Sequence, residues 1–121
     1  MPPKPIDDLK ETKLQKVFPV DPDTLSEPAI RETISSVDHA LTKGFKRIVL
    51  SVFHGTITNK ISVSRLLLHC QQTVRKKSGR LYLIEHCKPQ NSDYQNICST
   101  MNIPIYFDDR RFSEETEMVI N

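Results

Sequence analysis

The chain has no tryptophan, and its three glycines are widely separated, at Gly44, Gly55 and Gly79. A glycine-rich loop that cradles a phosphate or a dinucleotide therefore cannot form, which argues against the common nucleotide hydrolases and dinucleotide-binding enzymes. Aromatic residues are also scarce, with five Phe and three Tyr in 121 residues. We expect a core built mainly of Ile, Leu and Val.

Long apolar runs are missing as well. No segment approaches the length needed to cross a bilayer, and the first residues, MPPKPIDDLKETK, lack the apolar centre of a signal peptide. The three cysteines are odd in number, and each lies in or beside an apolar segment. We therefore expect a cytoplasmic protein without membrane insertion, in which Cys70, Cys87 and Cys98 are buried reduced thiols.

Apolar segments with the pattern of strands alternate with amphipathic helices. The strands are predicted at 16–20, 47–53, 80–85 and 103–107, and the helices at about 26–43, 62–78, 94–101 and from 113 onward. The spacing of apolar residues predicts the inner faces of the first two helices, Ile30, Ile34, Val37 and Leu41 in one and Val63, Leu66, Leu67, Cys70 and Val74 in the other. The connections are too long for hairpins, so the strands should be largely parallel. The prediction is an α/β fold, a small and mostly parallel four- to five-stranded sheet with helices packed against it. Residues 1–15 are expected to be a flexible arm or edge segment, and 16–121 a single domain.

Several residues predict where these elements end. Pro19 confines its strand to a sheet edge or to the strand's end. Thr24 or Ser26 can cap the first helix, and Gly44 ends it. Gly79 is expected to end the second helix in the same way, and Ser92 with Gln95 forms a capping box for the third.

The junction at residues 54–64 is the most promising place for a functional site. It follows the strongest apolar strand and carries the hydroxyls of Thr56, Thr58, Ser62 and Ser64. Open parallel sheets place their sites at the carboxyl ends of strands, and a helix N-terminus there attracts anions. Two readings stay open at this point, an anion or phosphoryl site and simple capping of the second helix by Ser62.

Metal binding and catalysis are not expected, nor is a cofactor. The pairs His69-Cys70 and His86-Cys87 contain possible zinc ligands, but adjacent residues point in different directions and no metal-binding spacing occurs. Cys87 and Cys98 could be nucleophiles only with a lowered thiol pKa, and nothing orients His86 towards a sulfur. With no acid–base pair, metal set or nucleophile elbow, we predict that the protein is not an enzyme.

The stretch GFKRIVLSVFHGTITNKISVSRLL, residues 44–67, resembles the centre of a STAS domain, the anti-sigma-factor-antagonist family. In that family a helix ends in Gly, an apolar strand and a short loop follow, and the next helix begins with an Asp-Ser-Ser/Thr-type motif. The later matching segments are 79–84, 94–101, 103–106 and 108–118, so the resemblance covers roughly residues 16–118. It implies a STAS-like fold for this chain.

The resemblance also shows where the family's phosphorylation motif is degenerate. An ungapped match places Ser51 where the family often has Asp, and Asn59 at the loop Asp. Lys60 and Ile61 then occupy the positions of the phosphorylatable hydroxyl and its neighbour. If the turn has slipped by one or two residues, Ser62 becomes the possible phospho-acceptor. Otherwise, Lys60 places a fixed positive charge that favours an acidic or phosphorylated partner.

The resemblance implies a non-enzymatic regulatory module that binds another protein, such as an anti-sigma factor of the kinase type, and acts in signalling and transcription regulation. The expected partner-binding residues are Thr58, Asn59, Lys60, Ser62, Ser64 and Arg65. The alternative is a small Alba-like nucleic-acid-binding domain. It is suggested by six basic residues and no acidic one between 54 and 84, although the formal net charge of the chain is only +2.

Overall fold

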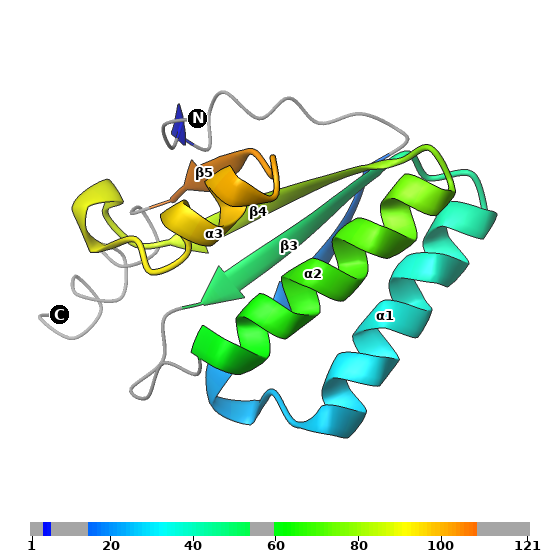
Figure 1. The fold of residues 1–121 in the computed structure, drawn as a ribbon, viewed down its shortest axis with the longest axis horizontal. Coiled ribbons are helices and arrows are strands. Elements are labelled where there is room, and N and C mark those ends of the chain that lie inside the picture. The colour runs from blue at the N-terminus through cyan, green and yellow to red at the C-terminus, as the bar shows by residue number, and fades with distance from the viewer. Residues whose placement is uncertain (1–3, 6–14, 54–59, 109–121) are drawn as a thin grey trace, which may run out of the picture.

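The computed structural model of the chain describes residues 4–5, 15–53 and 60–108 (Figure 1). Helices and strands alternate along these residues, as the sequence predicts. In chain order the elements are β1 (Lys4–Pro5), β2 (Gln15–Val20), η2 (Pro22–Thr24), α1 (Glu27–Thr42), β3 (Arg47–Phe53), α2 (Lys60–Lys76), β4 (Arg80–His86), η3 (Pro89–Asn91), α3 (Gln95–Thr100) and β5 (Ile105–Phe107).

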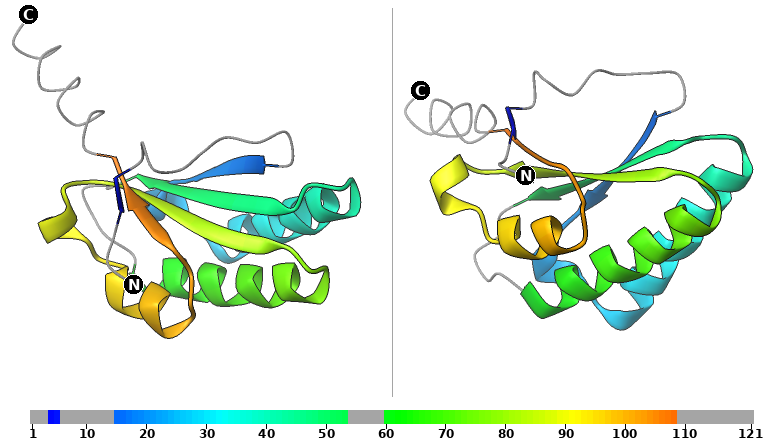
Figure 2. Two further views of the ribbon diagram at one scale, coloured as in Figure 1. Left: turned by 90° about the horizontal axis from the view of Figure 1, so that it is seen from above. Right: turned by 45° about the horizontal axis from the view of Figure 1, so that its top comes forward.

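The strands form one sheet in the order β1-β5-β4-β3-β2, and every neighbouring pair is parallel. From β2 to β5, each strand lies next to the one before it in the chain. Because crossovers between parallel strands are right-handed, a sheet that grows in one direction places its helices on one face. Figure 2 shows α1, α2 and α3 on the same face of the sheet. The predicted α/β fold with a small parallel sheet is confirmed.

The main core lies between this sheet face and the helices. β3 contributes Ile48, Leu50 and Val52, all fully buried. The buried side chains of α2 are Val63, Leu66, Leu67, Cys70, Gln71 and Val74, which include the whole predicted inner face. In α1, the predicted Ile30, Val37 and Leu41 are buried and Ile34 is half-buried. Burying an aliphatic side chain of this size contributes about 1.5–3 kcal/mol.

The opposite face of the sheet carries a second, smaller apolar cluster. Val49, Ile84 and Tyr106 are buried there, and Tyr82 packs against them. The guanidinium of Arg47 lies 4.8 Å from the centre of the Tyr82 ring, a cation–π distance. Since β3 has buried side chains on both faces, its apolar run is nearly continuous, as expected for a central parallel strand.

The ends of α1 are as predicted. Ser26 is the N-cap, and its hydroxyl accepts a hydrogen bond from the amide of Ala29 at 3.3 Å. Gly44 follows the C-cap with a φ of 107°, a conformation that glycine adopts without strain.

The predicted capping box of the third helix is wrong. Tyr94 is the N-cap of α3 and makes no side-chain capping bond. The hydroxyl of Ser92 instead donates a hydrogen bond to the buried carboxylate of Glu85 at 2.7 Å. The local sequence pattern predicted that the Ser92 side chain caps the helix. In the structure this side chain instead forms a hydrogen bond with a residue of β4.

The second helix also differs from expectation at both ends. It begins at Lys60 rather than near Ser62. After its last turn the left-handed residue is Ser78, with a φ of 58°, and not Gly79. Glycine is needed at position 79 for another reason, since a Cβ there would come within 2.8 Å of Leu41 Cδ2.

The edges of the sheet are formed by the two N-terminal strands. Lys4 and Pro5 pair with β5, so part of the segment 1–15 adds an edge strand. β2 forms the other edge, as the proline at position 19 predicts. The helix expected from Ser113 onward lies outside the described residues.

A substitution of Tyr94 tests the packing of the core. Its side chain is 1% exposed, and its hydroxyl has no hydrogen-bond partner in the described structure. A buried unsatisfied hydroxyl is destabilising, so we expect Tyr94→Phe to raise the free energy of unfolding by about 1 kcal/mol in urea denaturation. A loss of stability of the same size would contradict this description of the core.

Candidate functional site

Four of the six residues expected to contact a partner, Lys60, Ser62, Ser64 and Arg65, lie at the start of α2. Thr58 and Asn59 fall outside the described residues. Lys60 and Arg65 are exposed on the first two turns of the helix, and Ser64 is half-buried between them. Ser62, the possible phospho-acceptor, is half-buried and is the third residue of the helix.

A groove runs between α2 and α3, with a volume of about 340 Å³. The residues that line this α2–α3 groove are Lys60, Ile61, Ser64, Arg65, Leu68, Ile97 and Met101. It brings together three of the six predicted contact residues, namely Lys60, Ser64 and Arg65. Ser62 does not line it.

The groove is mostly apolar because α2 leaves two large side chains outside the core. Ile61 is 76% exposed and Leu68 is 45% exposed. They are seven residues apart, so they lie on one side of the helix, two turns from each other. Ile97 of α3 and Met101, the residue after this helix, line the other side of the groove. The sequence analysis missed Ile61 and Leu68 as contact residues, although both fall outside the predicted inner face of the helix.

The two basic side chains of the groove are already paired with acids. Lys60 Nζ lies 3.2 Å from Asp93 Oδ1, and Arg65 forms a salt bridge with Glu27 at the start of α1. The fixed positive charge of Lys60 is therefore shared with an acid of the protein itself. The rim of the groove combines positive and negative charge.

The position of Asp93 depends on a buried carboxylate at the end of β4. Glu85 is 1% exposed. Its two carboxylate oxygens accept hydrogen bonds from Ser92 Oγ and from the amide of Asp93, both at 2.7 Å. These bonds satisfy a charge that would otherwise be very unfavourable inside the protein. They also hold the chain before α3 in place, with Asp93 beside Lys60.

At the other end of the groove, two side chains of α2 contact the backbone just after α3. The side-chain amide of Gln71 donates a hydrogen bond to the carbonyl oxygen of Met101 at 3.0 Å, and Arg75 Nη2 lies 3.4 Å from the same oxygen. Together with the Lys60–Asp93 pair, these contacts link α2 to both ends of the α3 segment. The two walls of the groove are therefore joined to each other within the protein.

A second polar set lies on the sheet face away from the helices. Ser51 Oγ is 2.5 Å from His86 Nε2, and His86 Nδ1 is 3.8 Å from Asp108 Oδ2. The ring of Phe53 stacks on His86, with 4.4 Å between the ring centres. The three polar residues come from the ends of neighbouring strands, and only the strand register brings them together.

The contacts run from a serine to a histidine to an aspartate, as they do in the catalytic triad of a hydrolase. The surroundings of the serine, however, differ from those of a hydrolase nucleophile. Ser51 is 7% exposed and lies within β3, not on the sharp turn that presents a hydrolase nucleophile. The contacts cross-link the carboxyl ends of β3 and β4 and the residue after β5. Sequence reasoning missed the set because its members are 35 and 22 residues apart.

All three cysteines are buried and free, as predicted. Burial raises the thiol pKa of Cys70, Cys87 and Cys98 to about 12, and the Glu85 carboxylate adds to the effect at Cys87 and Cys98. His69 is exposed whereas Cys70 is buried, so these neighbours do point apart. Among the described residues no three or more His, Cys, Asp or Glu side chains are grouped as metal ligands. None of the helices described in the structure could span a membrane.

No protein-family model, curated protein sequence or solved structure matches this chain.

The raised thiol pKa values predict that the folded protein reacts slowly with thiol reagents. At pH 8 a thiol of pKa about 12 is ionised in only about one molecule in ten thousand. We expect Ellman's reagent to label the three cysteines at a rate set by unfolding, and rapidly once urea has unfolded the chain. Labelling of any cysteine in the native protein at the rate of a free thiol would contradict the burial described here.

Proposed function

We propose that this protein is a non-enzymatic, STAS-like regulatory module that binds a signalling protein through the α2–α3 groove. The proposed partner is an anti-sigma factor of the kinase type or a related regulatory protein. The observation that carries this proposal is the exposure of Ile61 and Leu68 on a groove between two helices.

Apolar burial would provide most of the binding energy. Covering Ile61 and Leu68 removes two large apolar side chains from water, and Ile97 and Met101 extend the same surface. A groove between two helices suits the apolar side of a partner helix. Contacts at both ends of the groove already join its walls. Binding therefore costs less conformational entropy than it would if the walls first had to come together.

The paired charges at the rim of the groove would fix the orientation in which the partner binds. Lys60 with Asp93 and Arg65 with Glu27 place both signs of charge beside the apolar surface. A partner with complementary charges could dock in one orientation only. The docking does not require a phosphate on Ser62, which is half-buried and outside the groove.

Substitution of the exposed apolar residues tests the proposal. Leu68→Glu and Ile61→Glu each put a charge into the contact surface, so we expect at least about tenfold weaker retention of a specific partner in pull-downs from the native cell. Lys60→Glu and Arg65→Glu should also weaken it. Val17→Glu is the matched control, because Val17 is 45% exposed like Leu68 but lies on β2.

All of these positions are partly or largely exposed, so thermal melts should show that the variants remain folded. A partner that binds the Leu68, Ile61, Lys60 and Arg65 variants as strongly as the unchanged protein would refute docking at this groove. A partner lost only with Val17→Glu would place the contact on the edge strand instead.

Nucleic-acid binding is a second candidate function because basic residues gather at the end of the sheet where β3 and β4 begin. We call this end of the sheet the basic edge. The loops before β3 and β4 meet there, and the amide of Arg80 donates a hydrogen bond to the carbonyl of Lys46 at 2.8 Å. The basic residues gathered on this edge are Lys43, Lys46, Arg75, Lys76, Lys77 and Arg80, all of them exposed. Lys77 is paired with Asp38 at 2.9 Å, and the sequence has no acid from His39 to Ile84.

Salt-dependent retention on RNA and DNA columns tests this second candidate. Phosphate contacts by several of these residues would give a steep fall in affinity with salt, and Lys76→Glu with Arg80→Glu would flatten it. Leu68→Glu should leave such retention unchanged. Weak retention that hardly depends on salt would exclude nucleic-acid binding by this edge.

A further inference from the structure

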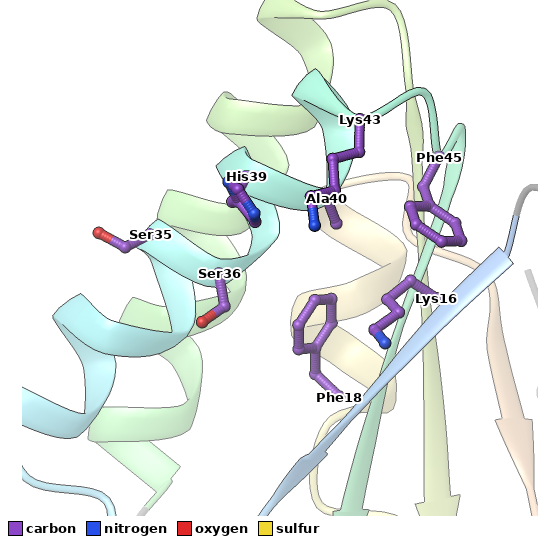
Figure 3. Close-up of a pocket in the computed structure, with 8 residues that line it drawn as sticks. All are labelled: Lys16, Phe18, Ser35, Ser36, His39, Ala40, Lys43 and Phe45. Carbon is purple, nitrogen blue, oxygen red and sulfur yellow. The ribbon is translucent and has the colours of Figure 1, made fainter.

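We propose that the groove between α1 and β2 binds a small organic anion, an aromatic ring that carries a carboxylate. Figure 3 shows this α1–β2 groove, which has a volume of about 530 Å³. Its lining residues are Lys16, Phe18, Ser35, Ser36, His39, Ala40, Lys43 and Phe45. The site is separate from the α2–α3 groove and does not depend on the function proposed for it.

The inner part of the groove is apolar and aromatic. β2 is the edge strand, and the alternation of side chains along it turns Phe18 towards α1. Figure 3 places the Phe18 ring between the strand and the helix, with the Phe45 ring at the upper end. Both rings are half-buried against the core, and Ala40 is small enough to leave space between them. Aromatic walls of this kind favour a flat ring.

The outer part of the groove is cationic. Lys16, Lys43 and the imidazole of His39 surround it, and no acidic side chain among the described residues lines it. None of these three has an ion-pair partner in the part of the chain that the structure describes. Lys16 Nζ lies 6.0 Å from the centre of the Phe45 ring, so one cation already sits beside an aromatic wall.

The contrast with other basic side chains strengthens the inference. Lys60, Arg65 and Lys77 each have an acidic partner within the protein. Among the described residues Lys16 and Lys43 have no such partner, so both can bind an anion from outside. An anion that also has an apolar ring would match both parts of the groove.

The end of α1 does not prevent an anion from binding there. A helix C-terminus carries partial negative charge on its last carbonyl groups. Here the amide of Lys43 donates to the carbonyl of His39 at 3.0 Å, and the amide of Phe45 donates to that of Ala40 at 3.1 Å. These bonds and the nearby lysines offset the charge of the helix end. The hydroxyls of Ser35 and Ser36 add hydrogen-bond donors along the helix.

The size and position of the groove favour a small molecule over a peptide strand. A volume of about 530 Å³ lies within the usual range for small-molecule sites. An added strand would have to pair with the free edge of β2, where Pro19 has no amide hydrogen to donate.

Naphthalene-2-carboxylate and its neutral carboxamide form a matched pair of probes, since the two have nearly the same shape. We expect the carboxylate to shift the backbone amide resonances of Ser36, His39 and Phe45 in NMR titrations. The carboxamide should bind at least about tenfold more weakly, because it lacks the charge that the lysines attract. Lys16→Glu and Lys43→Glu should each weaken carboxylate binding by about tenfold.

Lys46→Glu is the matched control, because Lys46 is exposed near the groove but does not line it. It should leave the affinity within about twofold of the unchanged protein. The proposal is overturned if millimolar carboxylate shifts no groove resonance, if the carboxamide binds equally well, or if Lys16→Glu and Lys43→Glu bind like Lys46→Glu. All three substituted lysines are on the surface, so folded variants are expected.

Discussion

The buried carboxylate of Glu85 is the interaction on which the arrangement of the α2–α3 groove depends. A carboxylate with 1% exposure must be hydrogen-bonded, and two of its bonds come from Ser92 and Asp93, at the start of the path to α3. The end of β4 thereby fixes where α3 begins. Asp93, held in this way, reaches Lys60 at the start of α2. One core residue thus connects the sheet to both walls of the groove.

The order of the strands explains why the α1–β2 and α2–α3 grooves differ in chemistry. Three helices lie on one face of a parallel sheet, α2 contacts α1 and forms a groove with α3, and α1 forms another groove with the edge strand β2 (Figure 3). Between α2 and α3, exposed aliphatic side chains are rimmed by ion pairs. Between α1 and β2, aromatic side chains are rimmed by cations that lack acidic partners among the described residues. The first surface suits a protein, and the second suits a small anion.

Much of the fold could be predicted because its signals are local. The apolar run of β3, the inner face of α2 and the glycine after α1 each follow from neighbouring residues, and each is confirmed. The features that failed depend on tertiary contacts. Ser92 caps no helix because its hydroxyl donates a hydrogen bond to Glu85, and the pairing of Lys60 with Asp93 could not be foreseen from the sequence.

The candidate site was predicted in part for the same reason. The strand–loop–helix pattern predicted a site at the start of α2, and three of the expected residues line the groove there. Its second wall could not be foreseen, since Ile97 and Met101 reach it only through the placement of α3. The set of Ser51, His86 and Asp108 likewise exists only through the register of three strands.

Hydrogen–deuterium exchange of the protein alone and with its captured partner tests docking at the α2–α3 groove most directly. We predict slower exchange on binding in residues 60–68 and 95–101, with no change in β2 or in residues 75–80. Protection of β2 or of the basic edge, with exchange in α2 and α3 unchanged, would contradict the account.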